Sequence, residues 1–114
     1  HRRREHAAAR DALRATLDTL LPEWHVPRIE GGLSTWVRFD APASSQLAIA
    51  ARSRGLRIAA GPWFGLDGAF ERHLRIPFAA GAESTIRAVE ILAEVWDGVA
   101  DAPRSLEPAL GAVV

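Results

Sequence analysis

Arg75 is the residue whose type and position best suit ligand chemistry. It lies at the centre of an alternating segment in which Leu74, Ile76 and Phe78 are apolar. This period-two pattern predicts a strand whose apolar side chains face a core, with Arg75 on the opposite face. If that face lines a cleft, the planar guanidinium suits bidentate binding of a carboxylate. The alternative is a solvated or structural ion pair, and strand geometry by itself favours that alternative.

Other site chemistries find little support in the sequence. The four histidines, His1, His6, His25 and His73, lack metal-ligand spacing and are expected to be structural or solvated. The chain has no cysteine, no GxSxG turn and no phosphate-binding loop. All 14 positively charged residues are arginine, so the chain has no lysine for a Schiff base with a cofactor aldehyde. The sequence therefore predicts no catalytic residue and no metal ligand in this chain.

Composition and charge indicate one globular domain. The 114 residues are 48% apolar and 25% charged, and their formal net charge is zero, which gives no overall electrostatic reason to bind nucleic acid or an anionic membrane. The Arg2–Arg4 run is expected to be a solvated helix face, diluted by Glu5 and Asp11. No apolar run approaches ~20 residues and the N-terminus is not signal-like, so we expect a cytoplasmic protein without a membrane partner.

The sequence also suggests something about its origin. It contains no methionine, which indicates a processed chain or a piece of a longer one. Its arginine and alanine bias fits a GC-rich bacterial genome.

Apolar residues at three- and four-residue spacing predict three helices, over residues 1–21, 44–55 and 83–97. Pro22 ends the first helix. The hydroxyl oxygens of Ser44 and Ser45 are expected to accept the unpaired N–H groups at the start of the second. That helix should end at Gly55 in a left-handed cap. Gly98 is expected to end the third helix, so that a loose or coiled tail follows over residues 99–114.

The remaining segments predict a small sheet. Strands are expected over residues 33–39, 56–60 and 74–78, with a shorter one over 23–26, and Pro77 places the last strand near a sheet edge. In the first of these, Leu33, Thr35, Val37 and Phe39 are expected to share one face. Residues 61–68 are expected to form a loop with buried aromatic side chains. The fold class is therefore α+β, a two-layer sandwich in which a mixed or antiparallel sheet of three or four strands is covered by helices.

Three stretches, in this order, resemble the C-terminal small domain of fold-type I, pyridoxal-phosphate (PLP)-dependent aminotransferases. They are GGLSTWV at residues 31–37, RGL at 54–56 followed by a Gly-Pro loop, and LRIPF at 74–78 followed by a helix containing AVEILA. The resemblance is greatest to the aminotransferase-like domain of MocR-type regulators in the GntR family of transcription factors. It covers roughly residues 1–98 and leaves 99–114 as a tail.

The resemblance implies site residues. Arg75 matches the arginine that binds the α-carboxylate of the ligand, Gly32 matches a glycine turn close to that carboxylate, and Phe64 would line the cleft mouth. The residues that hold PLP belong to a large domain absent from this chain. We therefore expect PLP in a full-length parent, no tight cofactor binding by this chain, and no transaminase activity of the chain alone.

Three function hypotheses follow. The parent is a MocR-type regulator whose small domain closes over a PLP and amino-acid site, a genuine PLP-dependent aminotransferase, or a protein in which this α+β domain mediates only assembly. The resemblance further implies a large-domain partner, an amino-acid or keto-acid ligand, homodimerisation, and DNA contact only through a missing N-terminal domain. Leu13, Leu17 and Trp24 are expected to be exposed without the large domain and to cause self-association.

Overall fold

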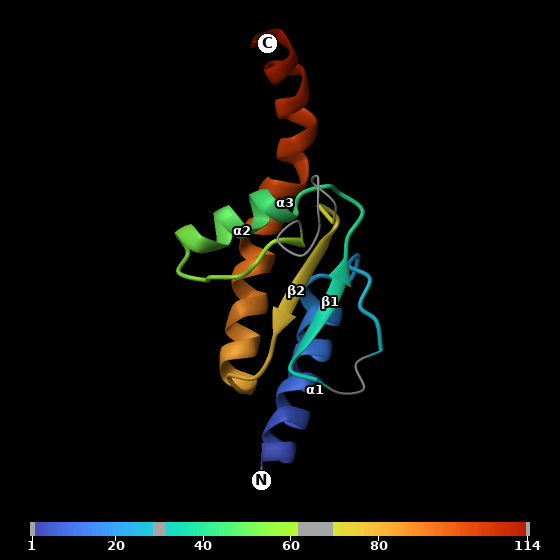
Figure 1. The fold of residues 1–114 in the computed structure, drawn as a ribbon, viewed down its shortest axis with the longest axis vertical. Coiled ribbons are helices and arrows are strands. Elements are labelled where there is room, and N and C mark those ends of the chain that lie inside the picture. Colours follow the sequence, from blue (N-terminus) through green and yellow to red (C-terminus); the bar gives the residue numbers. More distant parts are fainter. Residues whose placement is uncertain (1, 29–31, 62–69, 114) are drawn as a thin grey trace.

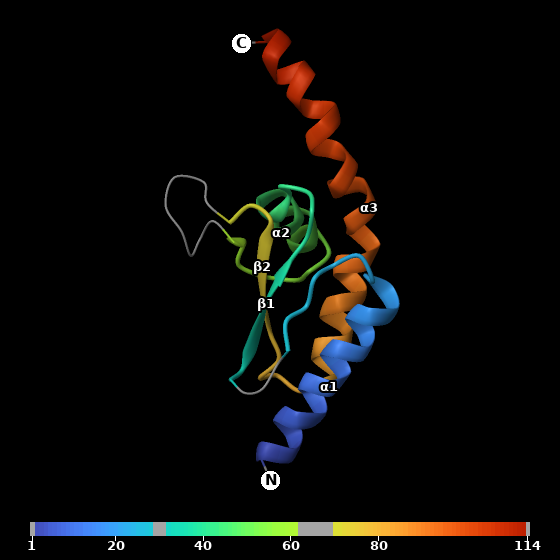
Figure 2. The same cartoon turned by 90° about the vertical axis from the view of Figure 1, so that its right-hand side faces the viewer.

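The computed structural model describes residues 2–28, 32–61 and 70–113, and it contains two strands and three helices (Figure 1). In chain order the elements are α1 (Arg2–Leu20), β1 (Ser34–Arg38), α2 (Ser44–Ser53), β2 (His73–Pro77) and α3 (Ala82–Val113). Helices α1 and α3 pack against each other and cover one face of the sheet, which Figure 2 shows edge-on. The predicted α+β class and the helix-covered sheet are confirmed.

The sheet has fewer strands than the sequence predicts. β1 and β2 pair antiparallel, with Trp36 opposite Arg75. On the outer edges of this pair, the expected strands over 23–26 and 56–60 are each reduced to one bridging residue, His25 beside β1 and Ala60 beside β2. The segment over 56–60 is joined to α2 by a hydrogen bond at its first residue, where the Leu56 N–H donates to the Ala51 carbonyl oxygen. The expected sheet of three or four strands is therefore two strands flanked by two isolated bridges.

Helix α2 begins differently from the expectation. The Glu71 carboxylate, which follows α2 by many residues, accepts hydrogen bonds from the Ser45 N–H at 2.8 Å and the Ser45 hydroxyl at 2.7 Å. The Ser44 hydroxyl instead accepts the Gly61 N–H at 2.8 Å. The prediction of serine caps was therefore wrong, because a distant carboxylate supplies the acceptor. At the other end, Gly55 has a φ of +89°, which confirms the predicted left-handed cap.

The core lies between the sheet and the helices. Along α1, Ala9, Leu13 and Leu17 recur every four residues and are fully buried. The strands contribute buried Val37, Leu74 and Ile76, and the residues just after the strands contribute Phe39 and Phe78. Trp24 packs against both Phe39 and Trp96, with ring centroids 5.0 and 5.1 Å away, and those two rings also contact each other at 4.9 Å. The expectation that Leu13, Leu17 and Trp24 would be exposed was therefore wrong, because all three are buried. α3, from the same chain, covers α1 and removes the proposed basis for self-association.

Helix α3 continues beyond the predicted end. Its backbone runs through Gly98 to Val113, and its C-terminal end projects beyond the rest of the molecule (Figure 1). Gly98 does not have the positive φ of a left-handed cap. A single helical glycine costs only about 1 kcal/mol relative to alanine, and the buried stripe Val89, Leu92, Trp96 continues to Val99. The expected coil over 99–114 was therefore wrong for the helical residues up to Val113.

Within the described residues, no helix combines the length and the apolar character that crossing a membrane requires.

Candidate functional site

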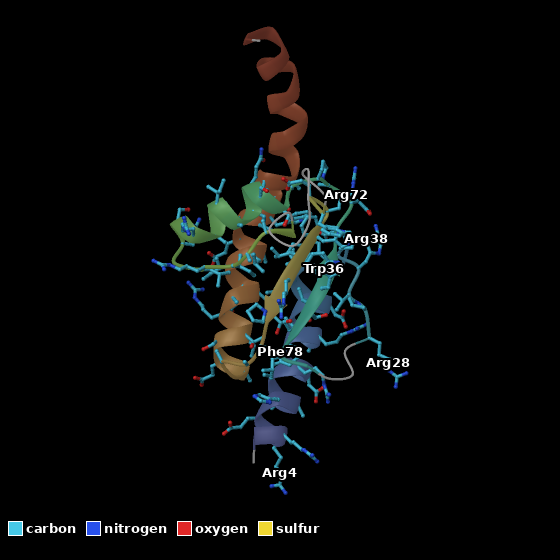
Figure 3. The ribbon with its side chains drawn as sticks, viewed as in Figure 1. Arg4, Arg28, Trp36, Arg38, Arg72 and Phe78 are labelled. Atoms are coloured by element: carbon cyan, nitrogen blue, oxygen red, sulfur yellow. The ribbon has the colours of Figure 1, made fainter. Side chains whose placement is uncertain are left out.

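The candidate site is the sheet face opposite the helices, here called the outward face. Its side chains come from alternate positions, Ser34, Trp36 and Arg38 on β1 and His73 and Arg75 on β2. In the strand register Trp36 lies opposite Arg75 and Arg38 lies opposite His73. Figure 3 labels Trp36 and Arg38, which lie one after the other along β1. The two strands thus bring together cationic and aromatic groups that are about 40 residues apart in the sequence.

Arg75 occupies the position that the sequence predicts. It is exposed, whereas its neighbours Leu74 and Ile76 are fully buried. Its Nε–H donates a hydrogen bond to the Ser34 Oγ at 2.8 Å, diagonally across the two strands. This bond anchors one edge of the guanidinium to β1. A guanidinium oriented in this way presents a planar fork of N–H donors, which is the geometry that binds carboxylates.

Beside Arg75 lies an aromatic cluster of Trp36, Phe70 and His73. The Trp36 and His73 rings stack with centroids 5.1 Å apart and planes 14° apart. Phe70 contacts both rings edge-on, at 5.4 Å from Trp36 and 5.6 Å from His73. Offset and edge-on arrangements are the favourable ones for aromatic rings. The cluster therefore holds the indole of Trp36 in one orientation beside the cation.

The imidazole of His73 is part of this cluster. Burial, and then the positive charge of Arg38, lower the pKa of the His73 side chain below its ordinary value of 6.5. Its Nδ1 is buried and has no hydrogen-bond partner among the described residues. Because both effects disfavour the charged ring, His73 is neutral at pH 7. The cationic groups of the outward face are therefore its arginines.

A cavity of about 410 Å³ opens between Arg75 and the aromatic cluster. It is lined by Ser34, Thr35, Trp36, Phe70 and Arg75. The volume lies within the roughly 300–1,000 Å³ of small-molecule sites. The cavity has a hydroxyl and a guanidinium among its polar groups, and two aromatic rings among its apolar ones. It can accept an anion attached to an apolar group.

The structure places the other predicted residues as follows. Gly32 has a φ of +77° and lies two residues before Ser34, so the left-handed turn comes next to the residue that contacts Arg75. Phe64 lies outside the described residues, as does the loop over 61–68 except for Gly61. The turn and the arginine are thus near the same strand pair, and the role of Phe64 stays a prediction.

Sequence reasoning missed the aromatic cluster and Ser34. The alternation that places Arg75 outward also places His73 outward, two residues earlier, and does the same for Ser34 and Trp36 on β1. This signal was present in the sequence. The register that sets Trp36 opposite Arg75 was not, because it depends on the pairing of two distant segments.

Other polar groups form separate local contacts. Asp40 lies 3.3 Å from the His25 Nε2 and 3.4 Å from an Arg38 guanidinium nitrogen. Arg4 lies near the N-terminal end of α1, far from the upper half of the sheet (Figure 3). Among residues 2–28, 32–61 and 70–113, no group of three or more metal-ligating side chains occurs. The geometry therefore favours Arg75 as the candidate site, where the guanidinium would bind the carboxylate of a ligand.

Comparison with solved structures identifies the fold. The chain is similar to LysN, an α-aminoadipate aminotransferase from Thermus thermophilus, with 25% identity and a TM-score of 0.73 over 85% of this chain and 26% of that one. It is also similar to an aspartate transaminase from Corynebacterium glutamicum, at 16% identity and a TM-score of 0.72 over 81% of this chain and 23% of that one. An archaeal alanine:glyoxylate aminotransferase gives 18% identity and a TM-score of 0.71 over 82% of this chain and 24% of that one.

The chain has an aminotransferase small-domain fold. It spans about a quarter of the length of these aminotransferases. No family model matches the sequence, and no curated protein matches it. The MocR-type resemblance is therefore neither supported nor contradicted by these comparisons.

The residues of this chain do not fit PLP itself. LysN was solved with N-(5'-phosphopyridoxyl)-L-leucine, a PLP derivative that carries an amino acid. This chain has no lysine that could link to a cofactor aldehyde. What the outward face offers is a guanidinium and a hydroxyl, which suit the carboxylate of an amino-acid ligand.

Proposed function

We propose that this chain is the small domain of a larger protein that binds PLP, and that Arg75 binds the α-carboxylate of an amino-acid or keto-acid ligand. The observation that carries the proposal is the exposed Arg75 guanidinium, anchored to Ser34 Oγ at the edge of a cavity. Gly32 forms the turn near the carboxylate, and Phe64 lines the cleft mouth. The chemistry of PLP belongs to the large domain, and this chain contributes binding and orientation.

The physical argument starts from charge. A carboxylate bound by a guanidinium through two parallel N–H···O bonds is held in one plane, which orients the rest of the ligand. The Ser34 hydroxyl accepts from Arg75 Nε, so the guanidinium does not need to be ordered by the ligand. A ligand that contacts both domains favours the closed arrangement by the difference between its affinities for the closed and open states. On this domain, we assign the difference in ligand affinity between the closed and open states to the contact of Arg75 with the carboxylate.

The first test uses this chain and a simple anion. Propanoate is titrated into ¹⁵N-labelled protein, with propanamide as the uncharged probe, and the Trp36 indole N–H resonance is followed in every variant, together with the Arg75 Nε–H where that group is present. We expect propanoate to shift both resonances of the unmodified chain and Arg75→Gln to weaken binding roughly tenfold, since a charge-assisted hydrogen bond contributes about 1.5–3 kcal/mol. Arg72→Gln is the matched control, because Arg72 is also exposed and lies three residues away. Equal binding by both variants would refute the role of Arg75.

Two identities of the parent fit this role. The first is a MocR-type regulator of the GntR family, a cytoplasmic homodimer that binds DNA through an N-terminal domain. It is supported by the strand that carries Trp36, by Pro77 in the LRIPF segment, where the enzymes commonly have a serine, and by the arginine-rich α1. The second is a PLP-dependent aminotransferase, which is favoured by the activities named for the three similar solved structures.

The reading frame upstream of His1 separates these identities. A winged-helix segment followed by a large domain with a cofactor lysine would support the regulator. The same large domain without a DNA-binding segment would support the aminotransferase, and Arg75 would then be a substrate-binding residue. A frame without such a large domain would overturn both and leave a domain that mediates assembly.

A further inference from the structure

We infer that the cavity beside Arg75 selects ligands in which the carboxylate carries an aromatic side chain, such as an aromatic amino acid or its keto acid. The inference rests on the proposed carboxylate contact of Arg75 and adds the class of side chain that lies next to it. Three features of the outward face support it, namely the lining of the cavity, the backbone of Phe70 and the stacking of Trp36.

Among the described residues, the lining of the cavity combines a cation with two aromatic rings. Arg75 and Ser34 supply the groups for an anion, while Trp36 and Phe70 supply aromatic surface in the same cavity of about 410 Å³. A ligand with only a short aliphatic group would leave this aromatic surface uncovered. A planar ring joined to the carboxylate by a short linker matches both parts of the lining.

Phe70 is held in place by its backbone. Among the described residues it is the one non-glycine residue with a positive φ, at 69°, and its side chain is nevertheless 42% exposed. Its carbonyl oxygen accepts the His73 N–H at 3.0 Å. It also packs so closely on Gly61 that a Cβ at position 61 would overlap it. A left-handed phenylalanine persists where its surroundings enforce it, and such positions are concentrated at ligand sites.

Trp36 is held in one orientation by its neighbours. Its indole stacks on the neutral imidazole of His73 and meets the edge of Phe70. The two rings that line the cavity are therefore fixed relative to each other at 5.4 Å between centroids. Because little side-chain freedom remains to be lost, the aromatic surface binds a ring with a small entropic cost.

The test compares three probes on the ¹⁵N-labelled 114-residue chain at constant ionic strength. They are 3-phenylpropanoate, 3-cyclohexylpropanoate, which keeps the charge and approximate size but lacks the aromatic ring, and 3-phenylpropanamide, which keeps the ring but lacks the charge. We expect 3-phenylpropanoate to bind roughly two- to tenfold more tightly than the cyclohexyl probe, the range given by one favourable ring–ring contact. Its ring protons should give nuclear Overhauser effects to Phe70 and Trp36.

Variants separate the two parts of the site. Phe70→Leu should remove the preference for the phenyl over the cyclohexyl probe, whereas Arg75→Gln should weaken both carboxylates and leave the amide unchanged. Leu20→Ala is the control, because Leu20 is similarly exposed, at 42%, but lies on α1. Far-UV circular dichroism checks that each variant is folded. The Overhauser effects in the unmodified chain test the proposal even if Phe70→Leu does not fold.

The possible failures are distinguishable. Equal binding of the phenyl and cyclohexyl carboxylates, with loss of both in Arg75→Gln, would overturn the aromatic selectivity and leave the carboxylate function standing. Equal binding of 3-phenylpropanoate and 3-phenylpropanamide, unaffected by Arg75→Gln, would overturn the carboxylate function instead. Shifts confined to residues outside the cavity, or no shift with any probe, would overturn both.

Discussion

The rings of Trp36 and His73 stack across the two strands, with centroids 5.1 Å apart and planes 14° apart. In the strand register Arg38 lies opposite His73 and Arg75 lies opposite Trp36. The imidazole thus lies against an indole and near a guanidinium. Burial of the ring and, after it, the positive charge of Arg38 lower the pKa of His73 and disfavour its protonated form.

This relationship predicts a pH-dependent stability. The pKa of His73 is lower in the folded chain than its ordinary value of 6.5, so in the window between the two values the unfolded state binds more protons. The free energy of unfolding should therefore fall as the pH falls through 6.5 and level off below the folded pKa. Urea unfolding of the chain and of His73→Phe, between about pH 8 and pH 5, measures this contribution as the difference between the two curves.

His73→Phe keeps a ring in the stack but removes the proton. The same substitution at His6, on α1, is the matched control for the loss of a histidine. Parallel pH dependence of the unmodified chain and His73→Phe would mean that His73 is not the group responsible. That outcome would contradict the lowered pKa of His73 in the aromatic cluster.

The parts of this fold that local pattern determines were predictable. Alternation correctly assigned Leu74 and Ile76 to the core and Arg75 to the opposite face, because a strand has only two faces. Leu33 is the exception: it belongs to the alternating pattern of β1, yet it is 49% exposed just before the first residue of that strand. The alternation of faces applies within a strand, and Leu33 lies outside β1, although its hydrogen-bonded neighbour just after β2, Phe78, is buried.

The local sequence pattern did not determine the contacts between distant segments. The carboxylate that caps α2 comes from Glu71, which is separated from Ser45 by 26 residues. The aromatic cluster needs both the register of β1 with β2 and the turn that carries Phe70. Neither has a local sequence signal, since each depends on how the chain returns to the sheet. The role of Phe64 in the cleft is a prediction that the described residues do not test.

Glu71 should stabilise the start of α2. Its carboxylate accepts two hydrogen bonds from Ser45, at 2.8 and 2.7 Å, where the N-cap residue Ala43 offers no side-chain acceptor. Glu71→Ala should lower the free energy of unfolding by about 1–2 kcal/mol, the usual range for loss of a helix cap. Urea unfolding followed by circular dichroism measures the change. Glu23→Ala, at an exposed position, should change stability by less than about 0.5 kcal/mol, and an equal effect at both sites would refute the capping role.

Leu17 and Leu20 provide a paired test of the core. Leu17 is fully buried, whereas Leu20, one turn later on α1, is 42% exposed. Leu17→Ala should cost about 2–5 kcal/mol through lost burial and a residual cavity, and Leu20→Ala less than about 1 kcal/mol. The two midpoints of urea unfolding give the comparison. Similar costs would indicate that α3 does not cover α1, and would restore Leu17 as a residue of an intermolecular contact.

Substitution by alanine should change the stability of the chain in opposite directions at two described glycines, Gly61 and Gly98. Gly61 packs against the carbonyl oxygens of Phe70 and His73, and an added Cβ would overlap both. Gly61→Ala should therefore destabilise the chain by about 1–3 kcal/mol, as expected when backbone atoms must shift to relieve overlap. A Cβ at Gly98, at an exposed position of α3, meets no atom within 4 Å. Gly98→Ala should stabilise the chain by about 0.5–1 kcal/mol through helix propensity.

Thermal and urea unfolding of the two variants measure these changes on one scale. Gly61→Ala should also disturb the outward face, because it displaces the turn that positions Phe70, in which the His73 N–H donates to the Phe70 carbonyl oxygen. The nuclear Overhauser effects between the Phe70 and Trp36 rings should then weaken, while they stay unchanged in Gly98→Ala. A stable Gly61→Ala variant with an intact ring contact would contradict the close packing that holds Phe70 in its left-handed conformation.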